Sequence, residues 1–148
     1  MTTLEITVEA LTKTFRTGVK QRMTALDAVT LTVEKGSCLA VVGESGSGKT
    51  TLARIIVGLE APDSGAVTVS SKPVVARANR RELRRRARDI QMVFQDPQSS
   101  LNRRLPVRVA VDEVLRAHSA LNRAERQRRC VELFTLVGLE PRFLVALP

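Results

Sequence analysis

The sequence predicts an α/β protein, because the spacing of its apolar residues changes from a strand period to a helix period across a glycine-rich loop. Between residues 4 and 42, apolar and polar residues mostly alternate, as they do on strands with one buried face. From Lys49 onward, apolar residues recur at offsets of three, four and seven, which places them on one face of a helix. We therefore expect β structure first and helical structure after the loop.

The elements expected before residue 62 follow in order along the chain. Alternation is clearest over residues 29–34, which predicts a half-buried strand. The continuous apolar run over residues 38–42 is typical of a strand buried on both faces. A helix then begins at Lys49, and we expect Gly58 and Pro62 to end it, since neither residue favours a helix interior.

The next segment combines two short strands with a basic helix. Val67 and Val69 alternate with polar neighbours and predict a strand. An arginine-rich helical segment over residues 77–88 follows. Alternation over residues 90–94 predicts a further strand, which ends at the polar loop of residues 95–100.

Beyond Pro106 the sequence predicts helices. Two apolar faces are expected, one of Val111, Val114, Leu115 and His118 and one of Cys130, Leu133, Phe134 and Val137. Asn122 followed by Glu125 resembles a capping box between them, and Gly138 and Pro141 end the last helix. We interpret His118, the one histidine, as a residue at the edge of a core and not as a catalytic group.

Composition excludes several classes of protein. The 148 residues are enough for one domain, and a hydrophobic share of 43% permits a packed core, unlike that of a disordered polyelectrolyte. No apolar run approaches the roughly 18 residues of a membrane span, and residues 1–5 lack the features of a secretory signal. We therefore expect a cytoplasmic protein.

The two cysteines, Cys38 and Cys130, are too few for a disulfide framework, and we interpret both as reduced packing residues.

The net charge of +9 is concentrated in residues 77–88, which contain seven arginines. One interpretation is a nucleic-acid-binding surface. The other is a solvated helix in which Glu82 pairs with Arg86 at i+4. We favour the second, because the chain has four Phe and no Trp or Tyr for base stacking.

A phosphate-loop motif follows the apolar run of residues 38–42. The pattern G-x-x-x-x-G-K-[ST] is matched by Gly43, Glu44, Ser45, Gly46, Ser47, Gly48, Lys49 and Thr50, with Thr51 next in the helix. Glycines allow the backbone amides to approach an anion, and the helix N-terminus adds further donors. Lys49 can reach the β- and γ-phosphates, and the Thr50 hydroxyl can bind Mg²⁺. The motif predicts a nucleoside triphosphate with Mg²⁺ as ligand.

The same region carries a family resemblance. The residues that carry it are 42–52, Gly58-Leu59, 62–65 and the run Ile90-Gln91-Met92-Val93-Phe94-Gln95-Asp96-Pro97-Gln98-Ser99-Ser100-Leu101-Asn102. The chain resembles the ATP-binding subunits of ABC transporters, most closely those of bacterial dipeptide, oligopeptide and nickel importers. This implies the N-terminal portion of a P-loop NTPase, with an antiparallel β subdomain, the start of a helical subdomain and an incomplete core sheet.

The resemblance also implies a division of residues 1–148. A β region would occupy residues 1–42, and the phosphate loop with its helix residues 43–60. A strand, the arginine-rich helix and a second strand would occupy residues 61–95. The glutamine loop and the start of the helical subdomain would occupy residues 96–148.

Two further site residues are implied by the resemblance. Phe15 corresponds to the aromatic residue that stacks on adenine, and Gln95 to the residue that contacts Mg²⁺ near the γ-phosphate of ATP. Taken alone, Phe15 would be an ordinary core aromatic and Gln95 a polar strand end. The implied partners are a transmembrane permease subunit and a second ATP-binding subunit, which would hold this chain at the inner face of the plasma membrane.

The sequence departs from the family in two ways. Arg103 replaces a usual proline and Arg108 a frequent glycine. No LSGGQ and no apolar strand followed by Asp-Glu occurs in these residues, so we expect a truncated ATPase with no catalytic residue of its own. We expect strands near Ala40 and Ile90 to have unpaired edges. A nucleotide-binding fragment without hydrolysis is the alternative to a working ATPase subunit.

Overall fold

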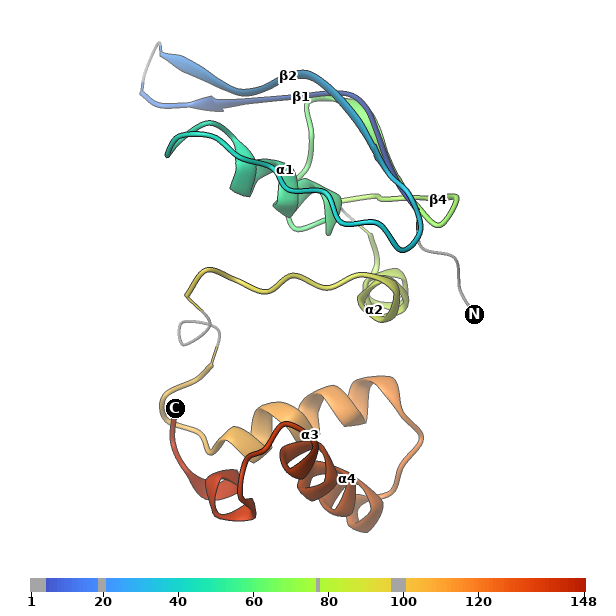
Figure 1. Ribbon diagram of the computed structural model, residues 1–148, viewed down its shortest axis with the longest axis vertical. Coiled ribbons are helices and arrows are strands. Elements are labelled where there is room, and N and C mark those ends of the chain that lie inside the picture. The colour runs from blue at the N-terminus through green and yellow to red at the C-terminus, as the bar shows by residue number, and fades with distance from the viewer. Residues whose placement is uncertain (1–4, 19–20, 77, 97–100) are drawn as a thin grey trace. The chain divides into compact units, whose positions relative to one another are not determined.

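The computed structural model describes residues 5–18, 21–76, 78–96 and 101–148, and the chain divides into two units (Figure 1). Among these residues, the first unit, Met1–Met92, contains the β-sheet and two helices, and the second unit, Val93–Pro148, contains helices only. Within the described residues, no helix has both the length and the apolar character that a membrane span requires.

The first unit is built on a four-stranded antiparallel sheet. Its strands are β1 (Ile6–Arg16), β2 (Arg22–Val33), β3 (Ser64–Val69) and β4 (Lys72–Pro73), in the order β2-β1-β3-β4. The predicted strands over residues 29–34 and 67–69 are therefore confirmed. The two long strands come from the alternating sequence before residue 42.

Register shifts bend the β1–β2 pair, and two of them contain an alanine with positive φ. Ala10 has φ 44° and Ala28 has φ 46°, a conformation that is costly for a residue with a Cβ. Ala10 donates its N–H to Thr30 Oγ1 at 3.0 Å, and Ala28 donates its N–H to Thr12 Oγ1 at 3.1 Å. Each strand thus supplies a threonine hydroxyl for the bulge of the other.

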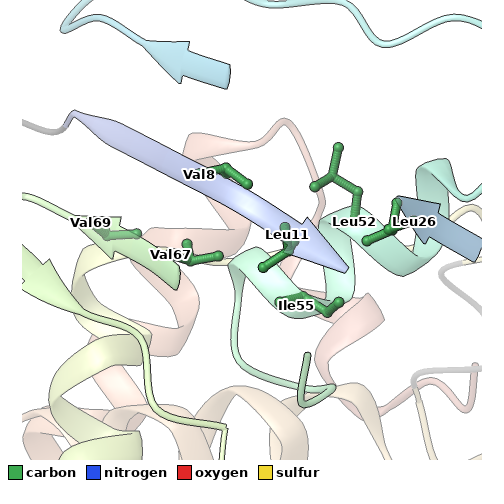
Figure 2. Close-up of a cluster of buried hydrophobic side chains, with 7 residues drawn as sticks. All are labelled: Val8, Leu11, Leu26, Leu52, Ile55, Val67 and Val69. Atoms are coloured by element: carbon green, nitrogen blue, oxygen red, sulfur yellow. The ribbon is translucent and has the colours of Figure 1, made fainter. Parts of the chain in front are cut away.

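Helix α1 (Lys49–Ile56) packs against this sheet (Figure 2). The predicted helix after Lys49 is confirmed, and Leu52 and Ile55 face the strands because residues three apart lie on one helix face. The buried core consists of Val8, Leu11, Leu26, Leu52, Ile55, Val67 and Val69. This core joins the phosphate-loop helix to three strands of the sheet.

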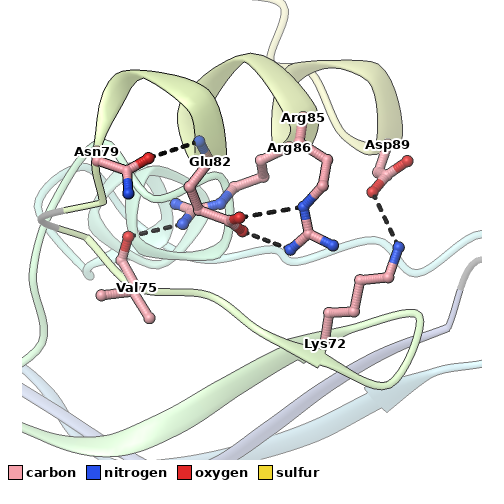
Figure 3. A network of polar contacts seen from close by, with 7 residues as sticks. All are labelled: Lys72, Val75, Asn79, Glu82, Arg85, Arg86 and Asp89. Atoms are coloured by element: carbon pink, nitrogen blue, oxygen red, sulfur yellow. Dashed lines mark hydrogen bonds and ion pairs between the residues drawn. The ribbon is translucent and has the colours of Figure 1, made fainter.

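Helix α2 (Arg80–Asp89) contains most of the arginine-rich segment, and Arg77 lies outside the described residues. Figure 3 shows the polar contacts of this helix. The side chain of Asn79 caps the helix by accepting the N–H of Glu82 at 3.0 Å. Glu82 pairs with Arg85 at 2.6 Å, so the expected pair with Arg86 is wrong.

Arg86 turns inward instead of facing solvent. It is 7% exposed, and its Nη2 donates to the carbonyl oxygen of Val75 at 2.7 Å. Gly58 has φ +76°, and a Cβ there would lie 1.9 Å from Arg86 Nη1. Glycine is therefore required at residue 58 both by the left-handed turn after α1 and by the buried guanidinium.

The predicted strands over residues 38–42 and 90–94 are not formed. Val42 is 91% exposed and Val93 is 90% exposed, and neither segment pairs with a strand among the described residues. A strand buried on both faces needs neighbours on both sides, which an apolar run alone cannot supply. Cys38 is exposed, so its interpretation as a packing residue is also wrong.

The second unit contains α3 (Val107–His118), α4 (Arg123–Leu136) and the 3₁₀ helix η2 (Pro141–Val145). The predicted capping box is confirmed: Asn122 Oδ1 accepts the N–H of Glu125 at 3.1 Å, and Glu125 Oε2 accepts the N–H of Asn122 at 2.7 Å. Arg126 of α4 pairs with Asp112 of α3 at 2.7 Å.

The apolar faces expected on these helices are formed only in part. Cys130 and Phe134 are buried, as predicted. Val114 and Val137 belong to the predicted apolar faces but are exposed. His118 is half-buried at the end of α3, which fits a residue at the edge of a core.

Candidate functional site

The phosphate-loop motif forms a tight turn directly before α1. Gly46 has φ +85° and Gly48 has φ +90°, and the N–H of Ser47 donates to the carbonyl oxygen of Glu44 at 3.2 Å. Helix α1 begins at Lys49, so the amide groups of its first turn, which have no carbonyl partner within the helix, lie next to this loop. Backbone donors thus gather where the motif predicts an anion.

Gly48 fixes the loop against β2. A Cβ at Gly48 would lie 2.2 Å from the carbonyl oxygen of Ala25 and 3.1 Å from Leu26 Cδ2. Ala25 is the extra residue of a register shift, since Lys13 pairs with Leu26 and Thr14 pairs with Thr24. The requirement for glycine here therefore comes from close packing on a bulged strand as well as from positive φ.

The ammonium group of Lys49 lies inside the loop. Its Nζ donates to the carbonyl oxygens of Gly43 at 2.7 Å and Glu44 at 2.5 Å, and to Ser47 Oγ at 3.1 Å. These neutral acceptors are weaker partners for an ammonium than a phosphate oxygen would be. The arrangement holds a positive charge at the loop and can exchange its carbonyl partners for an anion.

The other residues of the motif lie on the rim of the same turn. Glu44, Ser45, Ser47 and Thr50 are exposed, and Thr51 is half-buried at the start of α1. Thr50 and Thr51 bring two hydroxyls to the first turn of the helix. No group of three or more His, Cys, Asp or Glu side chains suited to a metal is found among the described residues. A magnesium ion here would depend on the Thr50 hydroxyl and phosphate oxygens, which the exposure of Thr50 allows.

Phe15 lies near the turn of the β1–β2 hairpin, and Gly48 packs against strand β2 of the same hairpin at Ala25. Phe15 pairs with Met23, two residues before Ala25, and it is half-buried. The Nζ of Lys13 lies 5.2 Å from the centroid of the Phe15 ring. The structure thus brings Phe15 and the phosphate loop to the same part of the first unit.

Gln95 is the other site residue that the family resemblance implies. It is exposed in a bend of the second unit, and residues 97–100 of its loop are outside the described residues. Its expected contact with Mg²⁺ stays a prediction.

Sequence reasoning missed the burial of Lys13, which contacts Phe15, and the burial of Arg86, which lies against Gly58. Lys13 is 9% exposed and occupies an inward position of β1 between Leu11 and Phe15. That alternation was a usable signal, because a charged residue at an inward strand position needs buried partners. No local pattern separates Arg86 from the exposed arginines beside it.

The chain is similar to known proteins. The family model for ABC transporters matches residues 26–144. The chain is 43% identical over 119 residues to the di/tripeptide transport ATP-binding protein DppF of Pseudomonas aeruginosa, covering 79% of this chain and 36% of that protein. It is 37% identical over 131 residues to the nickel import ATP-binding protein NikE of Brucella suis, covering 88% of this chain and 49% of that protein.

A solved structure is also similar. It is the dimeric post-hydrolysis state of the ATP-binding cassette MJ0796 bound to ADP and Pi, with a TM-score of 0.82 and 30% identity, covering 97% of this chain and 61% of that one. The chain thus spans less than half the length of these two curated relatives. Since the family model covers most of its residues, the chain belongs to the ABC transporter family.

Proposed function

We propose that this chain binds ATP with Mg²⁺ and forms part of the ATP-binding subunit of an importer for peptides or nickel. The observation that carries the proposal is the position of Lys49, whose ammonium group lies among the carbonyl oxygens of Gly43 and Glu44 beside the amide groups of α1. A cation and a set of backbone donors on one tight loop suit a polyphosphate.

Each residue of the motif has a role in this proposal. Lys49 would leave its carbonyl partners and donate to the β- and γ-phosphates. The amides from Ser45 to Thr51 would hold the phosphate oxygens, and Gly46 and Gly48 would let the backbone approach them. The Thr50 hydroxyl would hold Mg²⁺, which supplies charge neutralisation at the phosphates when it is bound.

Phe15 and Gln95 complete the proposed site. Phe15 would stack on the adenine ring, which its position near Gly48 supports. Gln95 would offer its carbonyl oxygen to Mg²⁺ and connect the state of the nucleotide to a membrane partner. Residues 1–148 would then act as one partial ATP-binding domain, with parts at residues 1–42, 43–60, 61–95 and 96–148.

The transport role rests on the names of the relatives. DppF and NikE are described as transport and import ATP-binding proteins, and MJ0796 is described as a dimer. We propose a permease subunit and a second ATP-binding subunit as partners, at the cytoplasmic face of a membrane. We also propose that hydrolysis needs groups outside these 148 residues, because they contain no LSGGQ and no apolar strand followed by Asp-Glu.

Isothermal titration calorimetry with ATP and Mg²⁺ tests the proposal. We expect Lys49→Ala to weaken binding by roughly ten- to a hundred-fold, because a charge-assisted hydrogen bond contributes about 1.5–3 kcal/mol. Lys35→Ala is the matched control, since Lys35 is an exposed lysine in the turn before the loop.

Two results would count against parts of the proposal. Equal affinities of wild type and Lys49→Ala would remove the phosphate loop as the binding site. Steady-state phosphate release by the 148-residue chain, abolished by Lys49→Ala, would show that hydrolysis needs no further groups.

A further inference from the structure

Lys13 is held more tightly than a surface lysine. Its Nζ lies 2.9 Å from Glu60 Oε1 and 3.5 Å from Asp63 Oδ1, and it donates to the carbonyl oxygen of Ala61 at 2.7 Å. The hydrogen bond with Glu60 raises the pKa of Lys13 above its usual range, although burial acts in the opposite direction. The ammonium therefore stays charged and in place.

The segment that holds Lys13 is itself attached to β1. The N–H of Asp63 donates to the carbonyl oxygen of Thr12 at 2.9 Å, and the N–H of Thr14 donates to Asp63 Oδ2 at 2.7 Å. These bonds flank Lys13 on both sides along the strand. The position of the charge relative to β1 is thus determined by main-chain contacts as well as by the side chain.

Phe15 lies on the same face of β1 as Lys13, because residues two apart on a strand point the same way. The 5.2 Å between Nζ and the ring centroid is within the range of a cation–π contact. Phe15 is half-buried, so part of its surface remains accessible. A fixed cation next to a partly accessible ring limits the orientations that the ring can adopt.

We propose that Lys13 is a positioning residue that orients the Phe15 ring for the base of the bound nucleotide. This inference rests on the proposed function, in which Phe15 stacks on adenine. Glu60 and Asp63, which pair with Lys13, lie in the segment that follows α1, so Lys13 connects the aromatic ring to the chain beyond the helix that begins at the phosphate loop.

The first experiment compares two ligands, Mg-ATP and Mg-tripolyphosphate, by calorimetry. Lys13→Met keeps the aliphatic stem and removes the charge. We expect it to weaken ATP binding by about two- to five-fold, the size of a cation–π contact, and to leave tripolyphosphate binding unchanged. We expect Lys13→Arg to restore most of the ATP affinity. Lys72→Met is the matched control, because Lys72 pairs with Asp89 at 3.8 Å elsewhere in the same unit.

The second experiment needs no nucleotide. The chain has four Phe and no Trp or Tyr, so the ring protons of Phe15 can be assigned in a simple aromatic NMR spectrum. We expect Lys13→Met to shift these resonances and Lys72→Met to leave them in place.

The outcomes separate the inference from the proposed function. Unchanged Phe15 resonances in Lys13→Met would overturn the positioning role. Shifted resonances with equal losses for ATP and tripolyphosphate would overturn its connection to the base and leave a structural role. If the wild-type chain binds neither ligand, the proposed function fails, and the resonances alone then decide whether Lys13 orients the ring.

Discussion

The two units of this chain differ in how they are held together. Among the described residues, the first unit buries Val8, Leu11, Leu26, Leu52, Ile55, Val67 and Val69 in one cluster, whereas the buried apolar residues of the second unit are Cys130 and Phe134. Burial of one large aliphatic side chain contributes roughly 1.5–3 kcal/mol. The phosphate loop therefore sits on the better packed unit, and the second unit depends more on individual contacts such as Arg126 with Asp112.

The largest expected effect comes from the core of the second unit. Phe134→Ala removes its one buried aromatic side chain and should cost about 3–5 kcal/mol, a typical value for such a truncation. We expect amide hydrogen exchange to become faster across α3 and α4, while β1 and α1 keep their protection. Loss of protection throughout the first unit would show that the two units unfold together.

The next prediction compares how much stability is lost when a glycine of each unit is replaced by alanine. Gly58 and Gly138 have φ +76° and +75°, but a Cβ at Gly138 meets nothing within 4 Å, whereas one at Gly58 meets Arg86. Gly138→Ala should cost about 1–2 kcal/mol from its backbone conformation. Gly58→Ala should cost a further 1–3 kcal/mol or so, because the displaced guanidinium leaves the carbonyl of Val75 unpaired.

Chemical denaturation of both variants measures this difference. The same substitution in an Arg86→Ala background provides the control, since the clash with the guanidinium is then absent and a contact with Val74 Cγ1 at 3.3 Å remains. There, Gly58→Ala should cost less than it does in the wild-type background. A cost for Gly58→Ala that does not depend on Arg86 would contradict the prediction.

The smallest effect concerns the two asparagine caps. Asn122→Ala and Asn79→Ala each remove one side-chain acceptor at a helix start, at a cost of about 1 kcal/mol. Although the costs are similar, we expect Asn122→Ala to reduce exchange protection in α4 alone and Asn79→Ala to reduce it in α2. If either variant changes the protection of the other unit, the separation described above is incomplete.

Sequence patterns predict this fold best where the determining contacts are local. The helix after Lys49 and the capping box of Asn122 and Glu125 follow from residues three or four apart, and both are formed. The apolar run before Gly43 predicts burial but cannot identify a neighbouring strand, and the structure leaves Val42 exposed.

The same distinction applies to the candidate site. The motif predicts which residues make up the loop, since their glycine and lysine spacing is set by the chain itself. The contact of Gly48 with Ala25 and the partners of Lys13 come from residues more than twenty positions away. Such contacts depend on register shifts and side-chain packing, which a single sequence does not display.

The exposed thiol of Cys38 gives this chain a practical advantage. Cys130 is buried, and that burial raises the pKa of its thiol, so a maleimide dye at neutral pH should attach to Cys38 in preference. Cys38 stands five residues before Gly43, and the chain has no Trp or Tyr to absorb or emit in the near ultraviolet. The fluorescence of a single dye on Cys38 would therefore report on the phosphate loop without emission from Trp or Tyr.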